Sequence, residues 1–380
     1  MGAAKGRRAA VKILHVYKDY YPVLGGIENH VRALAEAQAR LGHQVTVLVT
    51  GPGLRTERQE MGGVQVIKAG RLATVASTPL SLALPRELRR LQPDVVHVQS
   101  PYPVGEAANW LVGRGRATVV TYHSDVVRQR RMLALYAPVL RRVLRAAHRI
   151  IVTSPQYAAT SPFLAPVAGK CRLVPLGIDA SRFVTADPAQ VASLQARLGG
   201  PLLLFVGRLR YYKGLQYLLH ALVDLPGVHL AVVGTGPMEA EWKALAGSLG
   251  LAQRVAWLGD VPDAGLPALY HAADLFVLPA CERSEAYGLV QVEAMAAGRP
   301  VISTELGTGT SFVNRHGETG LVVPPRDPQA LAQACRELLA DPERRRCLGA
   351  QARRRALSEF GLDRMVQRVE EVYAEALCEQ

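Results

Sequence analysis

Two carboxylates within residues 280–300 have the type and spacing to bind a polar ligand. Glu285 and Glu293 are separated by seven residues, with Gly288 between them. An apolar run at 275–279 predicts a strand, and apolar residues with helical period follow the glycine: Leu289, Val292, Met295 and Ala296. A helix N-terminus after such a turn favours anions, because free N–H groups and the helix dipole point outward. The carboxylates beside it are expected to bind sugar and ribose hydroxyls. The alternative is an ordinary strand–helix unit with a solvated acidic loop.

Two cations lie in one short loop after another predicted strand, at 202–206. Arg208 and Lys213 stand between Gly207 and Gly214. Two fixed cations with helix-end amides suit a diphosphate, especially one that leaves with growing negative charge. The alternative is a pair of solvated loop cations. A further glycine loop begins at Gly234, but the run 234–239 lacks the third glycine of GxGxxG and supports a dinucleotide site poorly.

Candidate binding residues in the first half also follow predicted strands. Gly25 and Gly26 come after a strand at 11–16 and start a helix that runs to about Leu41. Two glycines there would let a ligand approach the backbone closely, or would simply form a helix-entry turn. His123 follows a strand at 117–122, and ligands bind at the carboxyl ends of such parallel strands. A structural role is the alternative for His123, and His97 on the neighbouring strand is predicted to be a core residue.

The basic charge of the chain is concentrated in its first half. The net charge is +13, and residues 1–178 carry 25 Lys and Arg against 9 Asp and Glu, whereas the remainder carries 20 against 23. Residues 127–149 predict a basic amphipathic helix with a kink at Pro138. One arc of this helix collects six arginines: Arg130, Arg131, Arg141, Arg142, Arg145 and Arg149. The arc predicts contact with an anionic membrane surface. A solvated face is the alternative, and nucleic acid is disfavoured because no aromatic residues interleave the arginines.

The whole chain predicts an α/β protein with two domains. Its 380 residues, 49% hydrophobic and 20% charged, are typical of globular proteins. Alternating strands and helices predict two tandem Rossmann-like, doubly wound parallel sheets facing a central cleft. The domains are expected at 1–180 and 181–362, joined by a passage at 180–200, with a helix at about 363–378 crossing back to the first. No secretory signal, membrane span or Cys-x-x-Cys motif is evident, which predicts a cytoplasmic location.

Taken together, these motifs resemble the retaining nucleotide-sugar glycosyltransferases of the GT-B fold, glycosyltransferase family 4. The resemblance rests on Gly25-Gly26-Ile-Glu, on His123 and on the stretch from Gly207-Arg208 to Lys213-Gly214. It continues through residues 284–298, which hold the Glu-x7-Glu element, and through 317–324. It implies a hexosyltransferase that moves a sugar from a nucleotide diphosphate donor to an acceptor hydroxyl.

The resemblance also implies a role for each candidate residue. Arg208 and Lys213 would hold the donor diphosphate, in a nucleotide-binding region that includes Gly207 and Gly234. Glu285 would meet the donor sugar, and Glu293 the ribose. The amides around Gly288, Leu289 and Val290 would contact sugar and phosphate oxygens, while Gly25 and Gly26 would bring a helix N-terminus to the phosphates. His123 would face the sugar and the acceptor as a polar positioner or proton partner.

Such enzymes typically need no metal and no cofactor beyond the donor. Front-face displacement, in which the departing phosphate assists acceptor deprotonation, is the expected route to retention. A covalent intermediate on Asp125 or Glu285 would contradict it.

Residues 303–320 resemble bacterial surface-polysaccharide enzymes, including mannosyltransferases. This favours a GDP-mannose donor, a glycan or lipid-linked acceptor, and a peripheral place on the inner face of the plasma membrane. The alternatives are a UDP-sugar donor with a small-molecule acceptor, a silent nucleotide-sugar-binding subunit, or an epimerase or phosphorylase on the same fold.

Overall fold

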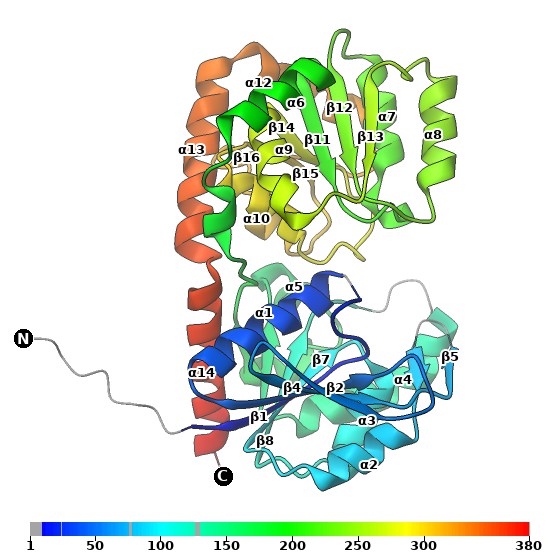
Figure 1. Ribbon diagram of the computed structural model, residues 1–380, viewed down its shortest axis with the longest axis vertical. Coiled ribbons are helices and arrows are strands. Elements are labelled where there is room, and N and C mark those ends of the chain that lie inside the picture. The colour runs from blue at the N-terminus through cyan, green and yellow to red at the C-terminus, as the bar shows by residue number, and fades with distance from the viewer. Residues whose placement is uncertain (1–9, 24, 76–77, 126–129, 380) are drawn as a thin grey trace, which may run out of the picture. The chain divides into compact units, whose positions relative to one another are not determined.

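The computed structural model describes residues 10–23, 25–75, 78–125 and 130–379, except for the side chains of 130–133 and 135. Contacts divide the chain into two compact units (Figure 1). The first unit comprises Met1–Thr153, Ser161–Val174 and Met365–Gln380, and the second comprises Ser154–Thr160 and Pro175–Arg364. Each unit has its own sheet with helices around it. The predicted α/β architecture of two Rossmann-like units is therefore confirmed.

The first unit is built on an eight-stranded sheet in the order β10-β9-β8-β7-β1-β2-β4-β3. All neighbouring strands are parallel except β3, which runs antiparallel to β4. A separate hairpin pairs β5 with β6. The strands are β1 (Lys12–Val16), β2 (Gln44–Thr50), β3 (Glu57–Met61), β4 (Val64–Ala69), β5 (Ala73–Val75), β6 (Thr78–Leu80), β7 (Val95–Ser100), β8 (Ala117–Tyr122), β9 (Arg149–Val152) and β10 (Cys171–Leu173).

The helices of this unit are α1 (Gly26–Arg40), α2 (Ala83–Arg90), α3 (Pro103–Val112), α4 (Arg130–Ala146) and α14 (Leu362–Cys378). Helix α14 buries one face at the spacing of an amphipathic helix, through Met365, Val366, Val369, Val372, Tyr373 and Ala376. Polar contacts also bind it to the unit. The Tyr373 hydroxyl lies 2.7 Å from His97 Nδ1, and Gln38 Nε2 donates to Glu370 Oε1 at 2.9 Å. As predicted, His97 is fully buried.

The second unit has a parallel six-stranded sheet in the order β13-β12-β11-β14-β15-β16. Its strands are β11 (Leu202–Val206), β12 (His229–Val233), β13 (Val255–Gly259), β14 (Leu275–Leu278), β15 (Val301–Thr304) and β16 (Gly320–Val323). Successive side chains of a strand point to opposite faces, so Leu202 and Leu204 join one core while Leu203 and Phe205 join the other. The strand order reverses between β11 and β14, and open α/β sheets bind ligands at such a point.

Helices cover both faces of this second sheet (Figure 1). Besides the short helix α5 (Pro155–Thr160), the helices of this unit are α6 (Pro188–Leu198), α7 (Leu215–Val223), α8 (Glu239–Ser248), α9 (Leu266–Ala272), α10 (Leu289–Ala296), α11 (Thr310–Val313), α12 (Pro328–Ala340) and α13 (Pro342–Glu359). Three of them start in the same way. Asp187, Asp327 and Asp341 each precede a proline and accept a hydrogen bond from a backbone N–H of the first turn.

Three expectations about local structure are wrong. Residues 180–200 are not merely a passage, because Asp187 and Pro188 start helix α6 and Val191, Leu194 and Leu198 pack into a core of the second unit. Residues 174–179 predict a strand and an exit turn, but the strand lies at Cys171–Leu173 instead. Apart from these expectations, residues 57–80, to which the sequence pattern assigns no element, hold strands β3, β4, β5 and β6.

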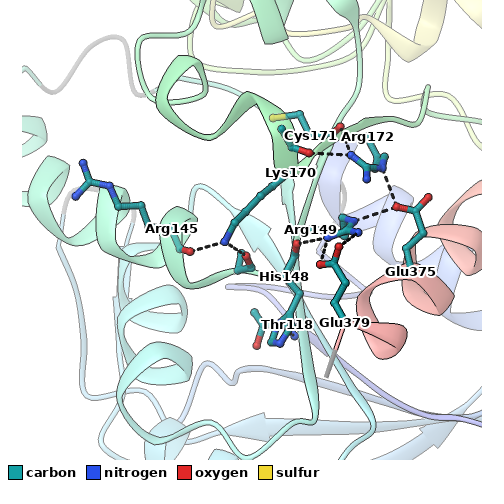
Figure 2. A network of polar contacts seen from close by, with 11 residues as sticks. Thr118, Arg145, His148, Arg149, Lys170, Cys171, Arg172, Glu375 and Glu379 are labelled. Carbon is teal, nitrogen blue, oxygen red and sulfur yellow. Dashed lines mark hydrogen bonds and ion pairs between the residues drawn. The ribbon is translucent and has the colours of Figure 1, made fainter.

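The third error concerns Arg149, which is not on the basic helix. Helix α4 ends at Ala146, and Arg149 opens β9, where it pairs with Val119 of β8. The periodic spacing of the arginines continues past Ala146, where the helix ends. Arg149 is buried and donates hydrogen bonds to Glu375 and Glu379 of the C-terminal segment, and Arg172 shares Glu375 (Figure 2). Through these contacts Arg149 attaches the C-terminal segment to β9, and it is not part of a basic surface.

The other five arginines of the predicted arc do fall on α4. The side chains of Arg130 and Arg131 lie outside the described residues. Arg141, Arg142 and Arg145 are exposed, and the Arg141 guanidinium lies 5.4 Å from the centre of the Phe163 ring. Among the described residues no helix is long and apolar enough to cross a bilayer.

Candidate functional site

The candidate site of the second unit is formed by the loops that leave β11 and β14, at the reversal of strand order. The first loop contains Gly207, Arg208 and a 3₁₀ helix, Tyr211–Lys213. The second spans residues 279–288. A backbone hydrogen bond joins them, from Cys281 N to Tyr212 O at 2.8 Å. The residues predicted from two distant parts of the chain therefore meet at one edge of the sheet.

Gly214 allows this close approach of the two loops. It has a φ of +68°, and a Cβ atom there would lie 2.0 Å from the carbonyl oxygen of Pro279. No other residue fits both the backbone conformation and the space. The glycine thus sets the position of Lys213, its neighbour in sequence, against the second loop.

Lys213 and Glu285 form a buried ion pair. Lys213 Nζ lies 2.7 Å from Glu285 Oε2, and the two side chains are only 10% and 8% exposed. Burial opposes the charge on Lys213, but Glu285, with contributions from Tyr212 and Glu293, more than offsets it, so the lysine pKa is raised. Thr308 fixes the second loop further, since its hydroxyl donates to the carbonyl of Glu285 at 2.9 Å. The opposite charges of Lys213 and Glu285 therefore offset each other, and both side chains are held in fixed positions in the site.

Arg208 differs from Lys213, although the sequence presents them as an equivalent pair. Its side chain is exposed, and the guanidinium has no ion-pair partner among the residues that the structure describes. A guanidinium binds two phosphate oxygens at once and stays charged at all working pH values. Arg208 therefore has an uncompensated charge to offer to an anion, as does Arg210, the other exposed arginine of this loop.

The N-terminus of α10 adds backbone donors to the site. Gly288 precedes the helix with a φ of +75°, and a Cβ atom there would lie 2.7 Å from Leu278 Cδ2. Within the described residues no side chain caps the start of the helix. The N–H groups of Leu289 and Val290 therefore point out of the first turn with the positive end of the helix dipole. The predicted anion site has the expected backbone geometry.

Glu293 lies one turn further along α10 and is held by a tyrosine. The hydroxyl of Tyr270, on helix α9, donates to Glu293 Oε2 at 2.6 Å. Burial raises the Glu293 pKa to about 7, even though the Tyr270 hydrogen bond opposes the shift. The carboxyl group therefore changes its charge close to neutral pH.

Gly207 and Gly234 lie at the same edge of the sheet. Gly207 N donates to Val233 O at 3.0 Å, and Gly234 N donates to Gly259 O at 2.7 Å. These bonds continue the sheet past the ends of β11 and β12. Gly234 has a φ of +114°, and a Cβ atom there would lie 2.3 Å from Gly207 O, so the fold itself requires glycine at this position. Binding of a ligand by Gly234 remains a prediction.

His123, Gly25 and Gly26 belong to the first unit. His123 is 4% exposed, its Nε2 lies 2.7 Å from Gln99 Oε1, and its ring meets that of His30 edge-on at 5.3 Å. Burial, with a smaller effect of His30, holds the His123 pKa well below 6.5. The imidazole is therefore neutral at physiological pH, as a residue needs to be to accept a proton.

The glycine pair starts α1 as predicted, but its first turn is already covered. Gly25 is the N-terminal cap, and a Cβ atom there would lie 2.2 Å from Glu28 Oε2. The Glu28 carboxylate thus lies over the helix N-terminus and would have to move for a phosphate to bind. Asp125, where a covalent intermediate would contradict the front-face route, accepts hydrogen bonds from Tyr122 at 2.7 Å and Ser161 at 2.8 Å.

Sequence reasoning missed the residues that hold the site in place. Tyr270 is one, and Arg283 is another. The Arg283 guanidinium donates to Gly307 O at 2.9 Å and to Thr160 Oγ1 at 2.9 Å, while the Tyr157 hydroxyl donates to Arg283 O at 3.0 Å. The loop that carries Glu285 is thereby anchored to helix α5. The sequence signal that could have identified Arg283 is its position two residues before Glu285.

Known proteins resemble the chain over almost its whole length. Residues 24–182 match the family described as "Glycosyltransferase Family 4", and residues 187–355 match "Glycosyl transferases group 1". A D-rhamnosyltransferase, WbpZ, of Pseudomonas aeruginosa is 39% identical over 91% of this chain and 92% of its own. The O-antigen chain mannosyltransferase C of Escherichia coli is 35% identical over 97% and 99%. Among solved structures, sucrose-phosphate synthase from Thermosynechococcus elongatus superposes with a TM-score of 0.80 at 25% identity, covering 97% of this chain and 99% of that one.

Proposed function

The chain belongs to glycosyltransferase family 4 and is a glycosyltransferase of the GT-B fold, and we propose that it transfers a manno-configured hexose from a GDP-sugar. The acceptor in this proposal is a hydroxyl group of a glycan or lipid-linked glycan. The observation that carries the sugar class is the pair of relatives with 39% and 35% identity over more than nine tenths of the chain. One is named for D-rhamnose and the other for mannose. D-rhamnose is 6-deoxy-D-mannose, so both names share the manno configuration.

The site of the second unit supports a nucleotide diphosphate sugar as donor. Arg208 would bind the diphosphate with both arms of its guanidinium, and the N–H groups of Leu289 and Val290 would bind further donor oxygens. Glu293 would accept hydrogen bonds from the ribose hydroxyls. The buried Lys213 would hold the Glu285 carboxylate in place, oriented towards the donor sugar. In this arrangement protein groups alone balance the charge of the leaving diphosphate, and no metal is needed.

The proposed reaction is a front-face displacement. The bond from the anomeric carbon to the phosphate oxygen breaks, and a bond to the acceptor oxygen forms on the same face. The acceptor proton passes to an oxygen of the departing diphosphate, so no enzyme carboxylate is consumed. Arg208 stabilises the charge that grows on the leaving group. Asp125 already accepts two hydrogen bonds, at 2.7 and 2.8 Å, which supports a structural role for it.

Thermal unfolding with a panel of GDP-, UDP- and ADP-sugars, without added metal, tests the donor class. A ligand that binds only the folded protein raises the midpoint by mass action. We expect a shift with GDP and its manno-configured sugars. A shift with UDP-sugars alone would overturn the proposed base, and no shift with any nucleotide sugar would contradict nucleotide-sugar binding by this chain.

The relatives differ in the sugar that their names state, which makes D-rhamnose a second candidate. GDP-mannose and GDP-D-rhamnose differ only in the hydroxyl at C6. Turnover with each, using a mannose-terminated lipid-linked glycan as acceptor, separates the two. An NMR assignment of the anomeric configuration of the product tests retention, and an inverted product would contradict the front-face route.

A further inference from the structure

Tyr270 contacts the candidate nucleotide site through Glu293. It lies on helix α9, and its hydroxyl donates to Glu293 Oε2 at 2.6 Å. The carbonyl oxygen of Val290 lies farther from that hydroxyl, at 3.4 Å. A phenol has one proton to donate, and a short bond to an ionised acceptor is the stronger of the two. The carboxylate is therefore the main partner of the tyrosine.

The tyrosine ring cannot turn away from this contact. Tyr270 is fully buried, and its ring meets Phe183 edge-on at 5.6 Å and Phe276 at 5.8 Å. Burial, reinforced by the Glu293 charge, raises the Tyr270 pKa well above 10, so its hydroxyl keeps its proton throughout the working pH range. The tyrosine is thus a fixed donor directed at one oxygen of Glu293.

The other charged groups around Glu293 come from three elements. Asp263, which precedes α9, repels a negative charge on Glu293, whereas Arg182 and Lys213 favour it. Arg182 and Asp263 also face each other, with 3.6 Å between Arg182 Nη2 and Asp263 Oδ2. Burial dominates all of these effects and favours the neutral acid. The Tyr270 hydrogen bond is the strongest influence in the opposite direction.

We propose that Tyr270 is a positioning residue for the donor nucleotide, which holds the Glu293 carboxylate ionised and turned so that its other oxygen is presented to a diol. This inference rests on the proposed function, in which Glu293 binds the ribose. The tyrosine itself does not touch the donor. Its loss would therefore act on the pH range in which the nucleotide binds, rather than on the chemistry of transfer.

Calorimetric binding of GDP from pH 5.5 to 9 tests the proposal. For the unmodified enzyme we expect affinity to rise with pH, with a midpoint near the Glu293 pKa of about 7. In Tyr270→Phe the carboxyl loses the bond that favours its charge. Its midpoint should move up by about one pH unit, so that GDP binds about fivefold more weakly at pH 7, about tenfold more weakly at pH 5.5, and recovers by pH 9. In turnover assays at pH 7, KM should rise while kcat stays the same.

Tyr287→Phe is the matched control. Tyr287 is also buried in the second unit, and its hydroxyl donates to Leu176 O at 3.3 Å, away from Glu293. Its midpoint should equal that of the unmodified enzyme. Should Tyr270→Phe not fold, a fluorotyrosine at position 270, which is a stronger hydrogen-bond donor, should move the midpoint down instead.

Two negative outcomes are distinguishable. If Tyr270→Phe folds and keeps the original midpoint, the positioning role is wrong, whatever Glu293 does. If Glu293→Gln binds GDP as tightly as the unmodified enzyme at every pH, the ribose role of Glu293 fails, and with it the proposed function of this residue. The expected result for Glu293→Gln is weak binding without the neutral midpoint.

Discussion

Lys213 Nζ lies 2.7 Å from Glu285 Oε2, and this buried pair makes the two cations of the β11 loop unlike one another. Lys213 is engaged within the protein, whereas Arg208 is exposed. Replacing Lys213 should therefore affect both stability and activity, whereas replacing Arg208 should affect activity alone. Stability and activity can be separated at this one loop.

Replacing Lys213 by methionine should lower both stability and activity. It leaves Glu285 buried without its partner, which typically costs about 3–5 kcal/mol. Chemical denaturation measures the loss. The double variant Lys213→Met/Glu285→Gln should regain most of the stability and remain inactive. If Lys213→Met alone unfolds like the unmodified protein, the ion pair has no structural importance.

Replacing Arg208 by methionine should leave the unfolding midpoint unchanged and lower kcat by about 100-fold, the typical effect of removing one charge-stabilising donor. Arg210→Met is the matched control, because Arg210 is an exposed arginine two positions further along the same loop. It should retain activity. Equal losses in both variants would indicate a general effect of loop charge instead of a specific contact with the diphosphate.

The exposed arginines of α4 should decide binding to anionic membranes. Each basic residue near such a surface contributes about 1 kcal/mol, so Arg141→Glu with Arg142→Glu should weaken binding to anionic vesicles by at least about 30-fold. Vesicle sedimentation measures this. Arg149→Glu serves as the contrast, because Arg149 is buried against Glu375 and should destabilise the fold instead. Unchanged sedimentation of the double variant would rule out this membrane surface.

Acid should destabilise the first unit through its buried histidines. Burial lowers the His30 pKa from 6.5 to about 3. The unfolded chain therefore takes up a proton below pH 6.5 that the folded chain refuses, so stability present above that pH is lost as the pH falls towards 3. At pH 5 this one pKa difference lowers the free energy of unfolding by about 2 kcal/mol. His30→Leu should flatten the fall of the unfolding free energy between pH 6.5 and 5, and parallel curves would disprove the prediction.

The sequence was most informative where strands are buried on both faces. Leu202–Val206 and Leu275–Leu278 are uninterrupted apolar runs, and their bounds follow from composition. Strand β3 (Glu57–Met61) was missed because it is an antiparallel edge strand with mostly exposed polar residues, and such a pattern resembles a loop. Arg149 was misplaced because periodicity does not reveal where a helix ends.

The candidate site shows the same limit. The Glu-x7-Glu spacing places Glu285 and Glu293 around one helix start, since both are local to α10. The burial that distinguishes Lys213 from Arg208, and the contact of Tyr270 with Glu293, depend on how α9 and the β11 loop pack against that helix. These are contacts between separate elements, and a single sequence does not contain them.

Helix α14 gives the fold a required order of completion. Gln38 Nε2 and His97 Nδ1, both buried in the first unit, are paired with Glu370 and Tyr373. A ribosome makes these partners only after it has made the entire second unit. Until α14 is made, the first unit cannot complete its folding, because Gln38 and His97 lack these partners. The second unit does not depend on these contacts. Chaperone dependence of this protein should thus reside in its N-terminal half.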